Sequence, residues 1–229
     1  MVADVIIPAF NEADSIAKVI QDIPKQHIRQ IIVCNNGSTD QTSEKARNAG
    51  AVVIDEKKKG YGYACLAGIT FLKSLPEPPE IVVFLDGDYS DFPPDLPLLT
   101  RPIHDLNYDL VIGSRVQKAQ PGSITLQQKF GNKLATSLIR VLYGYRFSDL
   151  GPFRAIRWET LLSMDMQDMT YGWTVEMQVK AAQKKLKCIE VPVSYRPRIG
   201  RSKVSGTLKG TIAAGYKILW TILKLHRHE

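Results

Sequence analysis

Three carboxylates follow directly on a short apolar run of the sequence. The stretch VVFLDGDYSD (82–91) contains Asp86, Asp88 and Asp91. One interpretation is a solvated turn, because Asp and Gly are common turn residues. The other is a site for Mg²⁺ or Mn²⁺, since these ions bind carboxylate oxygens and complete their coordination with phosphate and water. Alternate residues that leave a strand can point to the same side, so Asp86 and Asp88, on either side of Gly87, are the candidate metal ligands.

A second cluster is basic and lies near the C-terminus. The stretch RPRIGRSKVS (196–205) carries its arginines and lysine around Gly200. Most charge runs are solvated surface, but arginine pairs phosphate oxygens bidentately, and a glycine-containing loop can close over a diphosphate. For this second interpretation the candidate residues are Arg201, Ser202 and Lys203. Two further arginines, Arg115 and Arg154, are candidates for binding an acceptor phosphate or the leaving group.

Two glycines lie at the expected start of a helix. In KKKGYGYACLAG (57–68), Gly60 and Gly62 follow a run of lysines. Glycine lets backbone N–H groups approach an anion, and the helix dipole favours negative charge there. The alternative is a flexible turn after a solvated lysine run. We expect the two glycines to face a nucleotide, with Lys59 as a further contact.

Short apolar runs alternate with helical patterns through the first half of the chain. The expected strands are residues 4–10, 30–34, 51–55, 80–86 and 109–114, and the expected helices are residues 11–22, 39–48 and 61–74. Such alternation predicts an α/β fold with a Rossmann-like, mostly parallel sheet and helices on both faces. Asn11 is expected to cap the first helix. Ligands of such sheets bind beyond the carboxyl ends of the strands, so residues 11–12, 35–40 and 86–91 should converge on one edge.

The second half of the chain is less regular and shows no repeat or linker. Helices are expected at residues 124–143, 173–185 and 207–225, and a strand at residues 188–196. The last helix is amphipathic and basic, which fits either a core-packed helix or a helix in a membrane interface. We expect a single domain, residues 1–229. Residues 1–116 form its first half, and residues 117–229, with the basic loop and the C-terminal helix, form its second half.

Composition narrows the class of partners. The 229 residues carry a formal net charge of +7, which favours anionic partners. No zinc-finger spacing or aromatic-rich RNA-binding signature accompanies this charge, so nucleic acid is the weaker option. No apolar stretch approaches the roughly 20 residues that span a bilayer, and no charged leader precedes the first strand. Cysteines without metal-like spacing indicate reduced thiols. These features predict a cytoplasmic protein, with the inner face of a membrane as a further location.

Six stretches of the chain occur in the order found in one enzyme family. They are IIPAFNE (6–12), NNGSTD (35–40), KGYGYACLAG (59–68), LDGDYSD (85–91), DLGPFRAI (149–156) and RIGRSKVSG (198–206). The chain resembles family-2 glycosyltransferases, and among them the polyprenyl-phosphate branch of the dolichol-phosphate mannose synthase type. The resemblance implies a GT-A fold and inverting transfer of a hexose from a nucleotide diphosphate sugar. It implies that residues 1–116 bind the nucleotide sugar and that residues 117–229 face the acceptor. It implies Mg²⁺ or Mn²⁺ held by Asp88 first and Asp86 second, and a basic loop over the nucleotide phosphates.

The resemblance also assigns the contacts to the donor base and ribose. The donor-facing residues that it implies after the first strand are Pro8, Ala9, Asn11 and Glu12. The family usually has paired acids where this chain has Asn35 and Asn36. The amide of Asn36 offers both a donor and an acceptor, so it can still meet the edge of a uracil. We therefore expect a UDP-sugar in preference to GDP-mannose.

The identity of the acceptor decides the mechanism. A hydroxyl acceptor needs a general base, for which Asp149 and Glu176 are the candidates. The alternatives are that Asp149 makes a structural hydrogen bond and that Glu176 is an exposed charge on a helix. A polyprenyl phosphate is already ionised near neutral pH, so residues such as Arg115 need only position it and neutralise charge. Gln127 and Gln128 stand where the synthases would have Arg and Ser. A polyprenyl phosphate is the leading expectation; a soluble or glycan hydroxyl, and a binding subunit without catalysis, are the alternatives.

Overall fold

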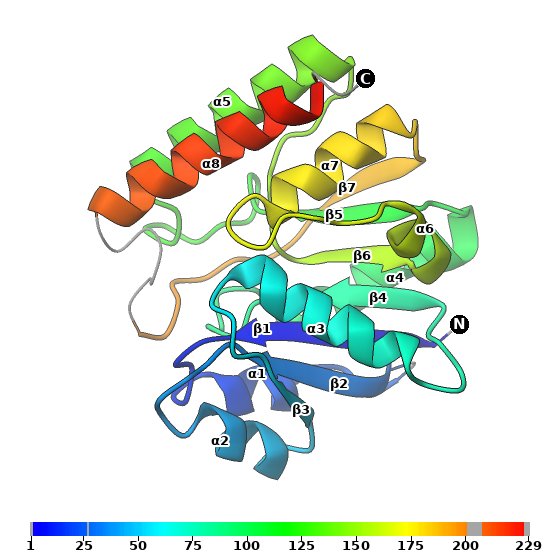
Figure 1. Cartoon of the computed structure of the whole chain (residues 1–229), viewed down its shortest axis with the longest axis vertical. Coiled ribbons are helices and arrows are strands. Elements are labelled where there is room, and N and C mark those ends of the chain that lie inside the picture. The colour runs from blue at the N-terminus through cyan, green and yellow to red at the C-terminus, as the bar shows by residue number, and fades with distance from the viewer. Residues whose placement is uncertain (1, 27, 201–207, 227–229) are drawn as a thin grey trace.

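The computed structural model describes residues 2–26, 28–200 and 208–226. Its centre is a seven-stranded sheet with the order β3-β2-β1-β4-β6-β5-β7 (Figure 1). The strands are β1 (Ala3–Ala9), β2 (Ile28–Asn35), β3 (Val52–Asp55), β4 (Ile81–Phe84), β5 (Leu110–Ser114), β6 (Arg154–Arg157) and β7 (Cys188–Pro192). The helices are α1 (Ile16–Asp22), α2 (Thr42–Asn48), α3 (Tyr61–Lys73), α4 (Leu96–Leu106) after a 3₁₀ turn η1 (Pro93–Asp95), α5 (Leu126–Tyr143), α6 (Trp158–Ser163), α7 (Trp173–Gln183) and α8 (Leu208–His226).

The sheet is mostly parallel, as the sequence predicts. β1 pairs in parallel with β2 and β4, β2 with β3, and β5 with β7. β6, which the sequence analysis did not identify, runs antiparallel between β4 and β5. Because β6 opposes both of its neighbours, β4 and β5 still point the same way. The carboxyl ends of β1, β2, β4, β5 and β7 therefore meet at one edge of the sheet.

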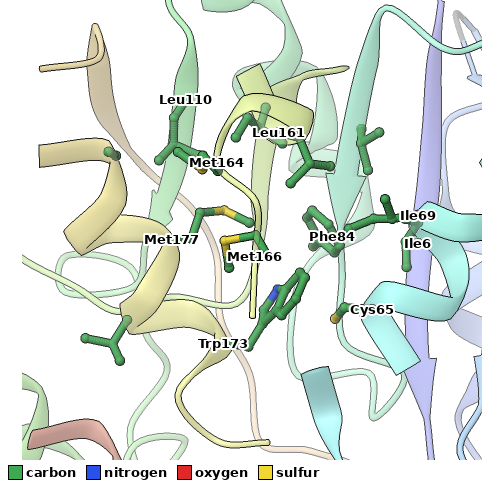
Figure 2. Packing of buried hydrophobic residues seen from close by; sticks show 14 of the residues in the cluster. Ile6, Cys65, Ile69, Phe84, Leu110, Leu161, Met164, Met166, Trp173 and Met177 are labelled. Atoms are coloured by element: carbon green, nitrogen blue, oxygen red, sulfur yellow. The ribbon is translucent and has the colours of Figure 1, made fainter. Parts of the chain in front are cut away.

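Helices cover both faces of the sheet and create two layers of core. The alternation of β1 sends Ile6 towards α3, α6 and α7, and Val5 and Ile7 towards α1, α2 and α4. In the first layer Phe84 meets Trp173 edge to face, with ring centroids 5.9 Å apart (Figure 2). Each large apolar side chain that is fully buried contributes about 1.5–3 kcal/mol relative to the exposed side chain. The sequence predicts helices on both faces of the sheet. Alternate buried residues of the strands hold these helices against the two faces.

The C-terminal helix α8 adds to the first layer of core. It packs on α5 and α7, with Ile222 buried and Ile218 and Leu225 half-buried against the core (Figure 1). Tyr216 and Trp220, by contrast, are exposed. The helix therefore combines both features that its amphipathic pattern allows, a packed face and an apolar outer face. In the part of the chain that the structure describes, no helix is long and apolar enough to cross a membrane.

Several element boundaries differ from the sequence-based expectations. α1 begins at Ile16 with Ser15 as its N-cap, so the prediction that Asn11 caps this helix is wrong. Asn11 has a left-handed backbone with φ of 53°, and its Oδ1 accepts a hydrogen bond from Thr39 N at 2.8 Å. A neighbouring loop, and not the helix, thus satisfies its side chain. The strand predicted at residues 188–196 ends at Pro192, and α4 and α6 were not predicted.

Candidate active site

Loops from distant parts of the sequence meet at the carboxyl edge of the sheet. After β1 and β2, Asn36 N donates to Ala9 O at 2.8 Å. After β1 and β4, Ser15 Oγ donates to Gly87 O at 2.8 Å. The sequence predicted this convergence from strand direction alone. The hydrogen bonds join the expected segments into one polar surface.

The acid loop, Asp86–Asp91, is held by hydrogen bonds from its own backbone and from Tyr61 and Ser90. Tyr61 Oη donates to Asp86 Oδ1 at 3.0 Å. Ser90 donates to Asp88 Oδ1 from its backbone N at 2.9 Å and from Oγ at 2.5 Å. Asp91 is 1% exposed, and its Oδ2 accepts from Asp86 N at 3.2 Å. Its Oδ1 is buried and has no hydrogen-bond partner among the residues that the structure describes. The loop therefore concentrates acidic oxygen atoms without fully pairing them.

The electrostatics of the loop reflect this crowding. Burial first, and the charge of Asp88 second, raise the pKa of Asp86 to about 7. Burial and the neighbouring Asp86 and Asp88 also raise the pKa of Asp91 well above its ordinary value. Carboxylates that share a low-dielectric site disfavour each other's ionisation unless a cation compensates. The acid loop is thus short of positive charge.

A divalent cation fits this arrangement. An orphaned, buried carboxylate oxygen beside two further acids is stabilised by a nearby cation. Among the residues that the structure describes, no group of three or more His, Cys, Asp or Glu side chains is arranged to hold a metal. The predicted ligands Asp86 and Asp88 would supply two carboxylates. That number suits Mg²⁺ or Mn²⁺, which complete their coordination with diphosphate oxygens and water.

A basic segment after β7 lies directly on the acid loop. Arg198 Nη1 forms an ion pair with Asp88 Oδ2 at 2.8 Å, and Ile199 N donates to Asp88 O at 3.0 Å. Arg196 N donates to Ser90 O at 2.9 Å. Arg198 was noted in the sequence only as part of the basic stretch. The predicted phosphate ligands Arg201, Ser202 and Lys203 lie outside the described residues.

Asn36 holds a loop, which differs from the expected contact with a base. Its Nδ2 donates to Lys58 O at 2.6 Å and to Glu56 O at 3.4 Å, and its Oδ1 accepts from Gly60 N at 2.7 Å. Both ends of the amide are therefore engaged with the backbone of residues 56–60. The prediction of a direct uracil contact does not fit this geometry. Asn36 instead shapes the segment that precedes α3.

The residues after β1 remain at the expected edge. Pro8 and Ala9 end the strand and are buried, with Pro8 in register with Cys34 of β2. Glu12 N donates to Thr42 Oγ1 at 2.8 Å, and its side chain accepts from Ser15 Oγ at 3.2 Å. These contacts fasten the first loop to the start of α2. The donor-facing roles of Pro8, Ala9 and Glu12 stay predictions.

Gly60 and Gly62 are required for close packing of two backbones. A Cβ on Gly60 would overlap Met169 O, and a Cβ on Gly62 would overlap Asp168 O. Gly60 also has φ of 151°, where glycine is favoured. The loop that contains residues 168 and 169 is joined to the start of α3 by Tyr63 N donating to Met169 O at 3.1 Å. These positions thus have a packing reason for glycine, and Gly60 N–H is already engaged by Asn36.

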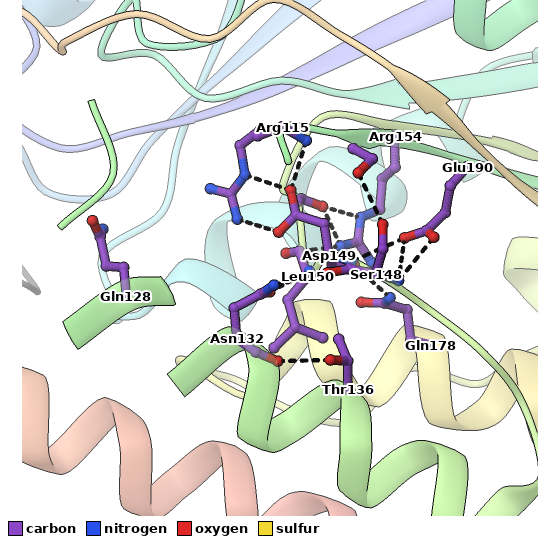
Figure 3. A network of polar contacts seen from close by, with 12 residues as sticks. Arg115, Gln128, Asn132, Thr136, Ser148, Asp149, Leu150, Arg154, Gln178 and Glu190 are labelled. Carbon is purple, nitrogen blue, oxygen red and sulfur yellow. Dashed lines mark hydrogen bonds and ion pairs between the residues drawn. The ribbon is translucent and has the colours of Figure 1, made fainter. Parts of the chain in front are cut away.

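Arg115 and Asp149 form the centre of a second polar network (Figure 3). Arg115 donates from Nε to Asp149 Oδ2 at 2.8 Å, from Nη2 to Oδ1 at 2.7 Å, and from its backbone N to Oδ2 at 2.8 Å. Burial opposes ionisation of Asp149, but the hydrogen bonds and charge of Arg115 outweigh it and hold the pKa of Asp149 below its usual value. The Asp149 carboxylate therefore orients Arg115 and is a poor proton acceptor.

A frame of side chains holds the Asp149 backbone in place (Figure 3). Glu190 Oε1 accepts from Asp149 N at 3.0 Å, and Gln178 Nε2 donates to Asp149 O at 2.9 Å. Asn132 of α5 accepts from Leu150 N at 2.8 Å. Sequence reasoning missed Glu190, Gln178 and Asn132, because no local pattern links them to residue 149. Tyr61 was missed as well, although it lies between the two glycines that the sequence singled out.

Glu176 is engaged in a structural role. Its Oε1 accepts from Gln167 N at 2.9 Å, its Oε2 accepts from Asp168 N at 2.7 Å, and Lys180 pairs with Oε1 at 2.8 Å. The side chain is 2% exposed as part of a buried residue on α7. Both oxygens are thus committed to the loop that packs on Gly60 and Gly62. The prediction that Glu176 acts as a general base does not fit this placement.

Arg154 lies inside the core rather than at the edge. The residue is fully buried, and its guanidinium donates to the carbonyl oxygens of Gly151, Leu150 and Thr174. Burial lowers its pKa to about 10, against the raising effects of Tyr61 and Asp149. Its N–H groups donate to the backbone just before β6 and to the backbone of α7. The predicted contact of Arg154 with a phosphate does not fit this geometry.

The fold, a mostly parallel sheet with helices on both faces, is of the GT-A type. The sequence model of the family "Glycosyl transferase family 2" matches residues 4–162. The chain belongs to this family and is a glycosyltransferase. The prediction of the family from the six sequence stretches is thereby confirmed, as is the predicted fold class.

Named relatives come from archaea and bacteria. The chain is 32% identical over 225 residues to a dolichyl-phosphate hexose transferase of Haloferax volcanii, covering 96% of this chain and 93% of the relative. It is 32% identical over 195 residues to glycosyltransferase AglJ of the same organism, covering 85% of this chain but only 63% of AglJ. Among solved structures, glucosyl-3-phosphoglycerate synthase of Mycobacterium tuberculosis, in complex with Mn²⁺, UDP and glucosyl-3-phosphoglycerate, has a TM-score of 0.78. That match has 23% identity and covers 97% of this chain and 79% of the synthase, and it shows the shared fold.

Proposed function

We propose that the chain transfers a hexose, with inversion, from a nucleotide diphosphate sugar to a polyprenyl phosphate, with Mg²⁺ or Mn²⁺ as cofactor. The observation that carries this proposal is the acid loop, where Asp86 and Asp88 adjoin a buried, unpaired oxygen of Asp91. A binding module has no need for such a concentration of buried acid. A UDP-sugar is proposed ahead of GDP-mannose, in line with the UDP bound by the fold relative from Mycobacterium tuberculosis.

Each part of the edge has a role in this scheme. A bound divalent ion would neutralise charge that develops on the leaving diphosphate, a Lewis-acid role worth several kcal/mol. Asp86 and Asp88 would hold that ion. The guanidinium of Arg198, beside Asp88, adds a positive charge at the same place. The backbone at Pro8 and Ala9, with Glu12, would border the donor base and ribose.

The state of the two predicted bases favours an acceptor that is already ionised. Asp149 is bonded to Arg115 at both oxygens and has a lowered pKa. Glu176 is bonded to two backbone N–H groups and Lys180. A hydroxyl acceptor would need a base that neither residue supplies, whereas a phosphate needs none. Arg115, held by Asp149, is the proposed contact for the acceptor phosphate.

The outer faces of α5 and α8 suit contact with an anionic membrane, where a polyprenyl phosphate would reside. On α5, Leu126, Phe130 and Val141 are 80%, 71% and 79% exposed, and on α8 Tyr216 and Trp220 are exposed. Neither helix contains Asp or Glu. The basic residues of these helices whose side chains are described are Lys129, Lys133, Arg140, Lys217 and Lys224. Exposed apolar residues bordered by cations, without acids, are typical of a helix at an anionic lipid interface.

The first test is calorimetry of donor binding with and without Mn²⁺. UDP-glucose, UDP-galactose, UDP-GlcNAc and GDP-mannose form the panel, and we expect metal-dependent binding of one UDP-sugar. Asp88→Asn should weaken that binding more than about tenfold, since even indirect partners of a metal contribute this much. Asp105→Asn, at an exposed position of α4, is the matched control. Equal binding by Asp88→Asn and the unaltered protein would remove the metal assignment.

Acceptor and membrane are tested separately. With the donor that binds, polyprenyl phosphate should yield a glycosylated lipid phosphate, while 3-phosphoglycerate serves as the soluble phosphorylated alternative. Phosphatidylcholine vesicles with phosphatidylglycerol should sediment the protein, and pure phosphatidylcholine vesicles should not. Leu126→Gln with Phe130→Gln should reduce this partitioning by about tenfold or more, because two apolar anchors are lost. Leu106→Gln, exposed on α4, is the control; equal loss in that variant would exclude a specific face.

A further inference from the structure

Arg198 forms an ion pair with the Asp88 oxygen that does not accept from Ser90. Asp88 Oδ1 accepts two hydrogen bonds from Ser90, so Oδ2 is the oxygen left for a cation. Arg198 Nη1 lies 2.8 Å from that Oδ2. The Asp88 side chain is 6% exposed, so this ion pair is shielded from solvent and its charge is not dispersed by water.

The backbone that carries Arg198 is fixed on the acid loop. Ile199 N donates to Asp88 O at 3.0 Å, and Arg196 N donates to Ser90 O at 2.9 Å. The guanidinium of Arg196 stacks on the ring of Tyr89, 3.3 Å from its centroid, and its Nε donates to Tyr89 O at 2.7 Å. The residues on both sides of Arg198 are therefore bound to the acid loop, which places the Arg198 side chain beside Asp88. Its own side chain, 27% exposed and with several rotatable bonds, can still turn to another anion.

We propose that Arg198 is a built-in counter-ion that competes with the divalent cation for Asp88, and that a bound diphosphate removes the competition by accepting the guanidinium. The inference rests on the proposed function, because it requires the metal and the diphosphate to bind at this loop. A divalent ion contacts a carboxylate oxygen at about 2.0–2.2 Å. A guanidinium on the same oxygen would then face a like charge within a few ångströms, which is unfavourable in a shielded site.

This competition couples the two ligands. The metal alone must displace Arg198 into water, whereas metal with nucleotide leaves Arg198 a diphosphate partner that it can bind bidentately. Metal and nucleotide should therefore strengthen each other's binding by the same factor, as thermodynamic linkage requires. Arg198 would then favour a site occupied by metal and diphosphate together over one occupied by metal alone.

The test measures Mn²⁺ affinity by electron paramagnetic resonance, with and without UDP, so that no turnover is needed. In the unaltered protein, UDP should strengthen Mn²⁺ binding by about tenfold or more, a coupling of the usual size. In Arg198→Met, Mn²⁺ alone should bind about tenfold more tightly. The factor by which UDP strengthens Mn²⁺ binding should become smaller than in the unaltered protein. Arg198→Lys keeps the charge and should keep weak binding of Mn²⁺ alone. Arg101→Met, on the exposed side of α4, is the control for loss of a surface arginine.

The outcomes separate this inference from the proposed function. If Mn²⁺ binds with UDP, but Arg198→Met leaves the affinity for Mn²⁺ alone unchanged or lower, Arg198 is not a competitor and the inference is wrong. If no protein binds Mn²⁺ even with UDP, the metal assignment fails and the inference fails with it. Arg198→Gln, which keeps a polar group near Asp88, serves as the second neutral variant if Arg198→Met is unstable in thermal unfolding. Tighter Mn²⁺ binding by both neutral variants supports the proposal.

Discussion

Removing the charge of Asp149 or of Arg115 tests whether this pair is a positioning device. Asp149 is 1% exposed and the Arg115 side chain 15% exposed, so each single change leaves a buried charge without its partner. The changes are Asp149→Asn, Arg115→Met and the double variant. They form a double-mutant cycle, which isolates the energy of interaction between two groups.

The expected magnitude follows from burial and geometry. Breaking a buried ion pair by removing one partner typically costs about 3–5 kcal/mol. Arg115→Met strands the more deeply buried Asp149, so about 4 kcal/mol is expected. Asp149→Asn strands Arg115, which keeps some solvent contact and lies 5.1 Å from the ring centroid of Tyr195, so about 3 kcal/mol is expected. The double variant removes both charges and should lose about 3–4 kcal/mol, well short of the sum, a coupling of about 3 kcal/mol.

The assay combines urea unfolding with transferase kinetics. Asp149→Asn should lower kcat/KM through misplacement of Arg115, and the pH dependence of kcat/KM should keep its shape, because Asp149 is ionised throughout the neutral range. Additive single costs in the cycle would show that the pair does not interact as the geometry indicates. Loss of a limb of the pH profile in Asp149→Asn, with stability unchanged, would make Asp149 a general base and refute the reasoning.

Three further changes test other parts of the structure. Gly62→Ala should destabilise the protein by about 2 kcal/mol or more in urea unfolding, because the new Cβ overlaps Asp168 O; an unchanged midpoint would contradict the packing role. Glu176→Gln should cost about 1–3 kcal/mol by removing the ion pair with Lys180 and one acceptor for the loop, and the shape of the pH–rate profile should stay the same; loss of a limb would restore the base assignment. Asp86 ionises near its ordinary value of 3.8 when unfolded but at about 7 when folded, so the folded metal-free protein holds the extra proton between these values. Its free energy of unfolding should therefore fall as pH rises from about 4 to about 7. Asp91, whose pKa is raised as well, contributes to this slope with the same sign, so Asp86→Asn should reduce the slope in urea titrations without abolishing it; a metal-free protein that gains stability over the same range would contradict the raised pKa.

Much of the fold could be predicted from local pattern. The runs that became β1, β2, β4 and β5 are rich in Val and Ile, as expected of strands buried on both faces. β6 is the exception. It has four residues, RAIR, and its pairing depends on the places left open by β4 and β5. A segment so short has too little pattern of its own to identify its state.

The candidate site could be predicted as a location but not as a set of contacts. Strand direction alone placed the acids of residues 86–91 and Asn36 at one edge, and the hydrogen bonds agree. Whether Asn36 faces a base or a backbone depended on Lys58 and Gly60, which complete its hydrogen bonds. The same residue type suits both roles, so only the neighbours could decide.

The sequence by itself determined the family, the alternation of strands and helices, and the edge at which the acids of residues 86–91 gather. Those features depend on residue order, periodicity and strand direction. The tertiary structure decided which charged side chains already have partners within the protein. Asp149 with Arg115, Glu176 with the 167–168 backbone and Arg198 with Asp88 are pairs brought together by packing. The physical reason is that ionisation and availability depend on burial and on partners within a few ångströms, and distance along the chain does not set either.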